Sequence, residues 1–379
     1  MPNSILFILE TPLNQKSIKA NLIQTLQMCK AYRDNNYDVT LLMPTTHSNE
    51  KSEEVINNIM PDAKGVKYIF SEFNSKFKFS QSLDRFTSLK KSISFTYDYY
   101  YTRSYFISQY IMRKGGQLIY ESHNAYFTKH KFFNKLMTSH MKKLMKKDNF
   151  KLFVTISDSL KNYWVDQTLN SSQIVALHDG AEPISDNIVV PEHLTSFFEE
   201  IGDRKIVLYA GSLYADRKVD RVIELARRSP EAYFVVVGGN PKEVEELKAQ
   251  AKGVENVKFL GKIEHKYISY MLTKADILLA IWSYDVPTMN YCSPLKVFEY
   301  MSAGKLIVAE GYLPILEVLK DQENALIAQP EDIDHLSSAI QSAIDNPQLM
   351  EIGVNNPALL EKKYTWDVRV KEIIKTLAA

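Results

Sequence analysis

Short apolar runs alternate with amphipathic segments along this chain, and the alternation restricts the possible folds more than any other feature. In the first half the apolar runs cover residues 5–9, 39–43, 117–121, 152–156 and 174–177. In the second half they cover residues 206–210, 233–237, 257–260, 276–281, 306–309 and 325–328. Helical patterns lie between these runs, as over residues 17–35 and 129–147. Near-continuous apolar strands separated by helices are typical of parallel sheets covered on both faces. The pattern therefore predicts an α/β chain with two doubly wound units in tandem.

Residues 180–205 form the predicted boundary between the two units. Pro183 and Pro191 interrupt regular structure there, and the charge balance changes sign. Residues 1–185 hold 24 Lys and Arg against 16 Asp and Glu, whereas residues 186–379 hold 22 against 29. We predict one Rossmann-like domain over residues 1–185 and a second over residues 186–360, facing each other across a cleft.

The overall composition excludes several classes of protein. The 379 residues carry a net charge of +1, so the total charge gives no argument for nucleic-acid binding. The chain has two cysteines, Cys29 and Cys292, which indicates no disulfide framework and a reducing compartment. The start of the chain lacks the basic segment of a signal peptide, and no run approaches the roughly 18 apolar residues of a membrane span. We expect a cytoplasmic protein, with peripheral contact at the inner face of the cell membrane left open.

Ligands of open parallel sheets bind beyond the carboxyl ends of the strands, so the loops there are the first place to look for chemistry. The segment SPLKVFEYMSAGKLIVAE at 293–310 follows such a strand. Ser293 is expected to cap a helix, with Pro294 at its first position and Gly304 at its end. The N-terminus of that helix suits a phosphate. Glu299 shares a helix face with Lys296; it either accepts hydrogen bonds from sugar hydroxyls or pairs with Lys296.

Two further loops follow predicted strands of the second unit. In IVLYAGSLYADRKVDR at 206–221 a strand ends at Gly211, and the loop carries Arg217 and Lys218. Adjacent cations in such a loop suit a diphosphate, although a solvated surface pair is the alternative. Gly238 and Gly239 end another strand and permit close approach of a ligand, but the sequence contains no Walker A or GxGxxG motif.

These motifs together resemble a known family. YAGSLYADRK, FVVVGG, VKFLGKIEHK, ADILLAIWS and SPLKVFEYMSAGK follow the order and spacing of the GT-B glycosyltransferases of family 4 (group 1). The first half carries weaker counterparts, namely YYTRS, LIYESHN, VTISDSLK and LHDGAEP. The tail at 361–379 is similar to the helix with which this family returns to its N-terminal domain. The resemblance implies a retaining transfer of a sugar from a nucleoside-diphosphate sugar, UDP being preferred, without a cofactor and without a metal ion.

The resemblance also implies roles for individual residues. Glu299 would hold the ribose hydroxyls, and Arg217 or Lys218 would bind the diphosphate, one residue of alignment deciding between them. His123 would approach the donor sugar from the N-terminal domain, so these four residues form the implied catalytic set. The implied donor-binding residues are Gly211, Ser212, Gly238, Ile263, Tyr291, Ser293, Pro294, Leu295 and Lys296, with the backbone of 294–296 around the distal phosphate and that of Ile263 near the base. Arg103 and Asn124 are the implied acceptor-side residues, for a saccharide, lipid-linked or other hydroxyl acceptor in cell-surface glycan biosynthesis.

Three departures from the family pattern keep other functions open. Tyr291 stands where the family has the first glutamate of its pair, and Val219 follows Lys218 where a glycine is usual. The glycine-rich loop after the first strand is replaced by ETPLNQKSIKAN at 10–21. The alternatives are a non-catalytic nucleotide-sugar-binding protein of the same fold, and an epimerase or phosphorylase with a GT-B fold.

Three other clusters have competing interpretations. Asp332 and Asp334 form a DxD, but we predict that they open a helix rather than bind a metal ion. Residues 129–147 contain seven lysines and no acidic residue. This segment either binds anionic lipid through an amphipathic face or is a helix with a core stripe and a solvated basic face. The aromatic cluster at 96–105 either stacks on sugars or supplies half-buried tyrosines of a strand and loop.

Overall fold

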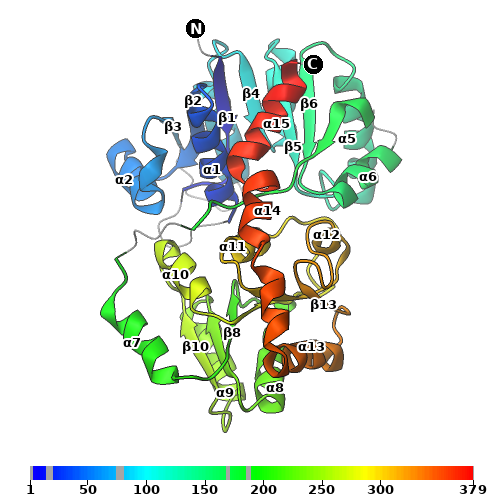
Figure 1. Cartoon of the computed structure of the whole chain (residues 1–379). Coiled ribbons are helices and arrows are strands. Elements are labelled where there is room, and N and C mark those ends of the chain that lie inside the picture. The colour runs from blue at the N-terminus through cyan, green and yellow to red at the C-terminus, as the bar shows by residue number, and fades with distance from the viewer. Residues whose placement is uncertain (1–2, 14–19, 74–80, 168–170, 185–188, 379) are drawn as a thin grey trace. The chain divides into compact units, whose positions relative to one another are not determined.

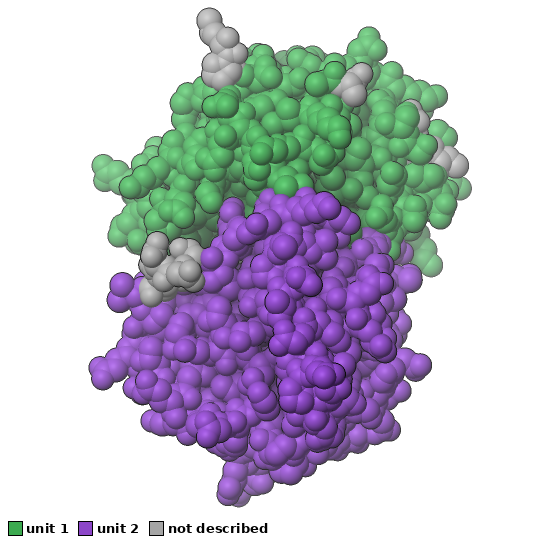
Figure 2. Space-filling model, viewed as in Figure 1, with its two compact units in different colours: residues 1–178, 366–379 green, residues 179–365 purple. Residues whose placement is uncertain are grey.

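The computed structural model divides the chain into two compact units (Figure 2). It describes residues 3–13, 20–73, 81–167, 171–184 and 189–378. Unit 1 comprises Met1–His178 and Trp366–Ala379, and unit 2 comprises Asp179–Thr365. Each unit contains one wholly parallel sheet flanked by helices, as the apolar runs predict (Figure 1).

The sheet of unit 1 has seven strands in the order β3-β2-β1-β4-β5-β6-β7. The strand order reverses between β1 and β4, so the loops that follow these two strands leave the sheet side by side. The strands are β1 (Ser4–Ile8), β2 (Asp38–Thr45), β3 (Lys67–Glu72), β4 (Tyr99–Thr102), β5 (Leu118–Ser122), β6 (Phe150–Thr155) and β7 (Ile174–Ala176). The helices are α1 (Ala20–Asp34), α2 (Asn49–Ile59), α3 (Gln81–Ser92), α4 (Tyr105–Arg113), α5 (Lys131–Leu144), α6 (Asp158–Asp166) and α15 (Trp366–Ala378). The start of the helix predicted from residue 17 lies outside the described residues.

The sheet of unit 2 has six strands in the order β10-β9-β8-β11-β12-β13, with the reversal between β8 and β11. Its strands are β8 (Ile206–Ala210), β9 (Tyr233–Val237), β10 (Val257–Gly261), β11 (Ile277–Ala280), β12 (Leu306–Glu310) and β13 (Leu326–Ala328). Its helices are α7 (Glu192–Ile201), α8 (Arg221–Arg228), α9 (Pro241–Gln250), α10 (Ile268–Thr273), α11 (Leu295–Ser302), α12 (Leu313–Leu316), α13 (Ile333–Asp345) and α14 (Asn356–Lys363).

Alternate residues of a strand in unit 2 enter two separate cores. Leu208 and Ala210 of β8 pack into the cluster on one face of the sheet. Val207 and Tyr209 of the same strand pack into the cluster on the other face. Because successive side chains of a strand point to opposite faces, a strand buried on both faces is apolar throughout. This explains why the strands of unit 2 are readable as continuous apolar runs.

The limits of the units differ by a few residues from the predicted boundaries after 185 and 360. The backbone N–H of Asp179 donates to the hydroxyl of Ser293 at 2.9 Å, and that of Ala181 donates to the carbonyl of Tyr364 at 3.1 Å. These bonds fix the chain to unit 2 directly after His178, before the prolines. The last helix, α15, belongs to unit 1 and packs against α1, where Asn35 donates to Asp367 at 2.8 Å.

Two local predictions are decided by the described residues. Asp332 caps α13 by accepting hydrogen bonds from the N–H groups of Asp334 and His335, which confirms the helix-start interpretation of the DxD. The aromatic cluster contains strand β4, in which Tyr100 and Tyr101 are buried in the core. These two rings are therefore not available to stack on a sugar. In the described part of the chain, no helix combines the length and apolarity needed to cross a bilayer.

Candidate functional site

Two glycine-bearing loops of unit 2 meet at the carboxyl ends of β8 and β9. The N–H of Gly211 donates to the carbonyl of Val237 at 2.9 Å, and Gly238 has a φ of 122°. A β-carbon on residue 238 would lie 1.8 Å from the carbonyl oxygen of Gly211. Residue 238 must therefore be glycine, both for its left-handed backbone and for the close approach of the two loops.

Helix α11 begins at the same edge of the sheet, one residue later than predicted. The cap position is Pro294, whose backbone is extended, and Leu295 is the first helical residue. The prediction that Ser293 caps the helix is wrong, because its hydroxyl accepts the hydrogen bond from Asp179. The first N–H groups of a helix have no partner within the helix, so those of Leu295 and Lys296 supply the positive end of its dipole.

Lys296 carries a buried charge at the start of this helix. Its Nζ is shielded from solvent and has no hydrogen-bond partner among the described residues. It lies 4.0 Å from the ring centroid of Tyr209 and 4.8 Å from that of Trp282. Burial, together with the charge of Arg217, lowers the pKa of Lys296 to about 7. An anion bound here would restore the ordinary charge of the ammonium group.

Arg217 is the second cation at this place. It forms no ion pair within the described ranges, and its Nε is buried without a hydrogen-bond partner. The neighbouring Asp216 also has one buried carboxylate oxygen without a partner. The charge of Arg217 lowers the pKa of both Lys296 and Cys292, so its guanidinium is near enough to act on them electrostatically. The start of α11 therefore combines the free N–H groups of a helix with Lys296 and the electrostatic influence of Arg217.

Lys218 is held differently from Arg217. Its Nζ lies 3.0 Å from Glu331 and 3.2 Å from Asp285, and hydrogen bonds to these two carboxylates raise its pKa. Its backbone is left-handed, with a φ of 49°, a conformation that favours glycine. Lys218 is therefore held by acidic partners in a backbone conformation typical of glycine, whereas Arg217 has no such ion pair among the described residues. The role of Arg217 toward a diphosphate stays a prediction.

Glu299 lies on α11, one turn after Lys296. Its carboxylate is 3.2 Å from Nε2 of His265, and this hydrogen bond raises the pKa of the imidazole against the effect of burial. Among the described residues Glu299 pairs with His265 and forms no ion pair with Lys296, so the alternative of a Lys296–Glu299 pair is not realised. The carboxylate remains partly exposed at the end of the β10 loop.

The remaining donor-side residues of unit 2 lie on the loops around this edge. Ile263, after β10, packs half-buried against the core. The carbonyl of Ser212 accepts a hydrogen bond from the Tyr209 hydroxyl at 3.0 Å, and the N–H of Tyr291 donates to the carbonyl of Thr288 at 2.9 Å. Their predicted contacts with a donor stay predictions.

In unit 1 the structure brings His123, Arg103 and Asn124 to one pocket. Its volume is about 420 Å³, and it lies where β4 and β5 end. Arg103 follows β4, while His123 and Asn124 follow β5. The three residues come from the separate motifs YYTRS and LIYESHN, and the fold gathers them into one cluster.

Glu121 organises this cluster, and the sequence reasoning missed it. Its carboxylate is fully buried and accepts hydrogen bonds from Gln24, at 3.0 Å, from the Tyr101 hydroxyl and from Nε2 of His123. Arg369 lies 3.1 Å and Arg103 3.2 Å from its oxygens. Burial acts to raise the pKa of Glu121, but the charges of Arg369, Arg103 and His123 hold it well below its ordinary value. A glutamate inside the apolar run LIYES was the available signal, since such a carboxylate needs buried partners.

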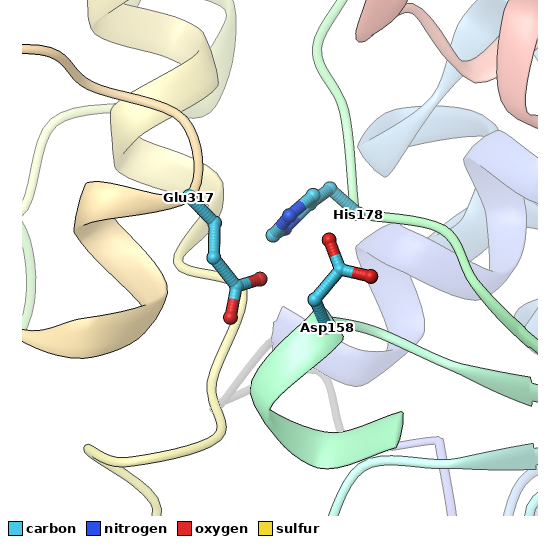
Figure 3. Close-up of side chains that lie close together, drawn as sticks. All are labelled: Asp158, His178 and Glu317. Carbon is cyan, nitrogen blue, oxygen red and sulfur yellow. The ribbon is translucent and has the colours of Figure 1, made fainter. Parts of the chain in front are cut away.

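Two further ionisable side chains of unit 1 lie close together beyond the carboxyl ends of β6 and β7. Asp158 starts α6, His178 is the last residue of this part of the unit, and their ligand atoms lie within 4.8 Å (Figure 3). Two groups from one unit are fewer than a metal site normally uses. The carbonyl of His178 accepts a hydrogen bond from Arg369 at 2.9 Å, which ties this end of the unit to α15.

The two doubly wound parallel sheets define the GT-B class of glycosyltransferase folds. HepE of Anabaena, solved with UDP-glucose, superimposes with a TM-score of 0.73 over 99% of both chains at 16% identity. Sucrose-phosphate synthase of Thermosynechococcus elongatus gives a TM-score of 0.73 over 98% of both chains, also at 16% identity. At this level of identity the likeness concerns the fold.

Residues 194–356 match the family described as glycosyl transferases group 1. The α-D-kanosaminyltransferase of Streptomyces kanamyceticus is 25% identical over 167 residues, 42% of each chain. An uncharacterised glycosyltransferase of Methanocaldococcus jannaschii is 24% identical over 233 residues, 58% of each chain. The phosphatidyl-myo-inositol mannosyltransferase of Mycobacterium leprae is 25% identical over 185 residues, 45% of this chain and 46% of that protein. The chain thus spans roughly two fifths to three fifths of the length of these relatives.

Proposed function

We propose that this protein is a retaining glycosyltransferase that moves a sugar from a nucleoside-diphosphate sugar, with UDP as the preferred nucleotide, to a hydroxyl acceptor. One observation carries the proposal: Nζ of Lys296, in the first turn of α11, and Nε of Arg217, whose charge acts on Lys296, are both buried without hydrogen-bond partners. Buried charges without partners are costly, and a diphosphate supplies the partners that both need.

The chemistry follows from this charge arrangement. The bond between the anomeric carbon and the distal phosphate oxygen breaks, and its electron pair stays on the diphosphate. The acceptor oxygen forms the new bond to the same carbon, and its proton passes to the departing phosphate. Arg217, Lys296 and the helix dipole stabilise the developing negative charge, which is the largest contribution that such a site makes to the rate. Since these groups supply positive charge of their own, we propose that the reaction requires no metal ion.

The neighbouring residues of unit 2 fit the rest of the donor. Glu299 is partly exposed and lies one turn along α11 from Lys296, which supports its assignment to the ribose hydroxyls once His265 moves aside. Gly211 and Gly238 let the two loops meet next to this site, since a β-carbon on residue 211 would lie 3.0 Å from Nζ of Lys296. The nearby loop that bears Ile263 is assigned to the base.

Unit 1 is proposed to bind the acceptor. Its pocket of about 420 Å³ is lined by Arg103, His123 and Asn124, whose polar groups can hydrogen-bond to a saccharide. Glu121 fixes the imidazole of His123 through Nε2. We assign His123 to the donor sugar and the other two residues to the acceptor hydroxyls.

The exposed face of α5 supports a proposal about location. Phe132, Phe133 and Leu136 are exposed in the first half of this helix, whereas Met141 and Leu144 are buried in the second. A core stripe explains the second pair but not the exposed aromatic residues. With the lysines of residues 129–147 around them, they favour peripheral binding to an anionic membrane on the cytoplasmic side, where a cell-surface glycan is built.

Calorimetric titration with UDP, GDP and ADP tests the donor assignment. We expect UDP to bind and a Lys296→Met variant to lose about 10- to 100-fold in affinity, as for a lost charge-assisted hydrogen bond. Lys274→Met, which removes an exposed lysine elsewhere in unit 2, is the matched control. No binding of any of the three nucleotides would remove the proposal. Slow hydrolysis of a UDP-sugar that is lost in Glu299→Ala distinguishes an enzyme from a binding protein.

A further inference from the structure

A second pocket of unit 1 adjoins the one that holds His123. Its volume is about 610 Å³, and it is lined by α3, the beginning of α4 and the residues after β1. Glu10 and Phe106 line both pockets, so the two share a wall. The strand order brings this about, because the loops after β1 and β4 leave the sheet at its point of reversal.

The lining of the second pocket is mainly apolar. Leu83, Phe86 and Leu89 come from α3, and Phe106 comes from α4. Leu83 is 67% exposed and Phe106 is 59% exposed, although both are large apolar side chains. The rings of Phe86 and Phe106 lie 6.2 Å apart in an edge-to-face arrangement. Exposed apolar side chains that gather at a concave site mark a place where a ligand covers them.

Polar groups are concentrated where the two pockets join. The carboxylate of Glu10 accepts a hydrogen bond from the Ser104 hydroxyl. Burial raises the pKa of Glu10, while the Ser104 hydrogen bond and the charge of Arg85 lower it. The first pocket continues this polar character with Arg103, His123 and Asn124. A ligand that spans both pockets would therefore be polar at one end and apolar at the other.

We propose that the acceptor is amphiphilic: its hydroxyl-bearing sugar occupies the pocket of His123 and Asn124, and its hydrocarbon part occupies the pocket of Leu83, Phe86 and Phe106. Glu10 accepts a hydrogen bond from a sugar hydroxyl at the junction. This inference rests on the proposed glycosyl transfer and narrows its acceptor to a glycoside with an apolar aglycone. A wholly polar saccharide would leave the apolar lining in water.

Binding of two simple glycosides to the full chain tests the inference. Octyl β-D-glucopyranoside, kept below its critical micelle concentration, is compared with methyl β-D-glucopyranoside by calorimetry. We expect the octyl glycoside to bind at least about tenfold more tightly, since each buried CH₂ group contributes about a fourfold factor when it is well covered. The double variant Leu83→Ser, Phe106→Ser should abolish this difference.

Phe132→Ser is the matched control, because Phe132 is 63% exposed, lies in the same unit and lines neither pocket. It should leave the preference for the octyl glycoside unchanged. Equal affinity for the two glycosides, no binding of the octyl glycoside, or equal loss in the control would overturn the inference. UDP binding to the same proteins separates the two proposals. The double variant of the apolar pocket should bind UDP as tightly as the unmodified protein does. If the unmodified protein does not bind UDP, that result counts only against the donor assignment.

Discussion

The guanidinium of Arg369 lies 3.1 Å from Oε2 of Glu121, and this ion pair joins the last helix of the chain to the middle of the unit 1 sheet. Both side chains are almost fully buried. Because Glu121 also binds His123 and Arg103, the C-terminal helix neutralises the carboxylate on which the candidate acceptor site is built. Arg369 further donates to the carbonyls of Leu177 and His178.

Removing Arg369 should therefore destabilise unit 1. In an Arg369→Met variant we expect the free energy of unfolding to fall by about 3–5 kcal/mol, because a buried carboxylate loses its partner. Urea unfolding followed by circular dichroism measures the change. Arg227→Met is the control, because that residue forms an exposed pair with Glu224 and should cost less than about 1 kcal/mol. A similar small loss in both variants would contradict the prediction.

The same pair predicts how stability depends on pH. The pKa of Glu121 is held well below its ordinary value, against the effect of burial, by Arg369, Arg103 and His123. Because the pKa of Glu121 is lower in the folded state, its ionisation stabilises the protein at pH values above the unfolded-state pKa of about 4.3. This stabilisation is lost as the pH falls through the pKa of the folded state. In Glu121→Gln the acid side of a stability profile should be flatter than in the unmodified protein. An unchanged profile would mean that folding does not lower the pKa of Glu121.

The central strands of unit 2, such as β8 and β11, could be predicted because each is buried on both faces and reads as a continuous apolar run. In unit 1, β3 was missed and β4 was only one of two alternatives, for the opposite reason. β3 has the sequence KYIFSE, with a half-buried pattern, and β4 is YYYT, whose tyrosines also suit a sugar-stacking surface. Composition alone does not distinguish a buried tyrosine from an exposed one. The contacts of β4 with β1 and β5 decide the matter.

The candidate site was only partly predictable, because its main features depend on geometry. Sequence could not choose between Arg217 and Lys218, whereas the left-handed backbone and acidic partners of Lys218 separate them. Lys296 was expected to contribute its backbone, and only the fold shows that its Nζ is buried over Tyr209. Arg369 is 248 residues away from Glu121 along the chain, so no local pattern connects them.

The lowered pKa of Lys296 predicts a pH dependence of nucleotide binding. In the free protein its pKa is about 7, and a bound diphosphate should raise it. Binding then takes up a proton, so the affinity for UDP should fall by up to about tenfold per pH unit as the pH rises from 7 to 9. Phosphate groups, with a pKa of about 6, stay ionised over this range. Calorimetry in buffers of different ionisation enthalpy measures the proton uptake directly.

Lys296→Arg is the control for this titration, because a guanidinium stays charged at all these pH values. The variant should bind UDP with an affinity that hardly changes between pH 7 and 9. If the unmodified protein shows the same flat profile, Lys296 does not change its charge on binding.

The hydrogen bond between His265 and Glu299 gives a further test of the ribose site. The pKa of His265 is raised by this bond, so ribose hydroxyls that take over the carboxylate should lower it. We expect the NMR titration of His265 to move to lower pH when UDP is saturating. His265→Ala should retain UDP affinity within about threefold, whereas Glu299→Ala should lose about tenfold or more, as for hydrogen bonds to a charged group. An unchanged His265 titration would place the ribose elsewhere.

We predict that Gly238 is essential for the close packing of the loops that follow β8 and β9. In Gly238→Ala the new β-carbon would lie 1.8 Å from the carbonyl oxygen of Gly211, and the backbone has a φ of 122°. We expect a loss of at least about 3 kcal/mol in the free energy of unfolding, or misfolding of unit 2. Gly253→Ala is the matched control, because Gly253 also has a positive φ, of 82°, but no atom within 4 Å of its β-carbon position. It should lose only about 1–2 kcal/mol for the strained backbone.

The membrane proposal predicts that the protein co-sediments with anionic liposomes through α5. Binding to vesicles of phosphatidylcholine with phosphatidylglycerol should exceed binding to phosphatidylcholine alone, and added salt should weaken it because the lysine contribution is screened. A Phe132→Ser, Phe133→Ser variant should lose most of the bound fraction, because the exposed rings supply the apolar insertion. Leu313→Ser, which removes an equally exposed apolar side chain from α12 in unit 2, should bind normally. Sedimentation that is indifferent to anionic lipid content would show instead that the basic face of α5 is simply solvated.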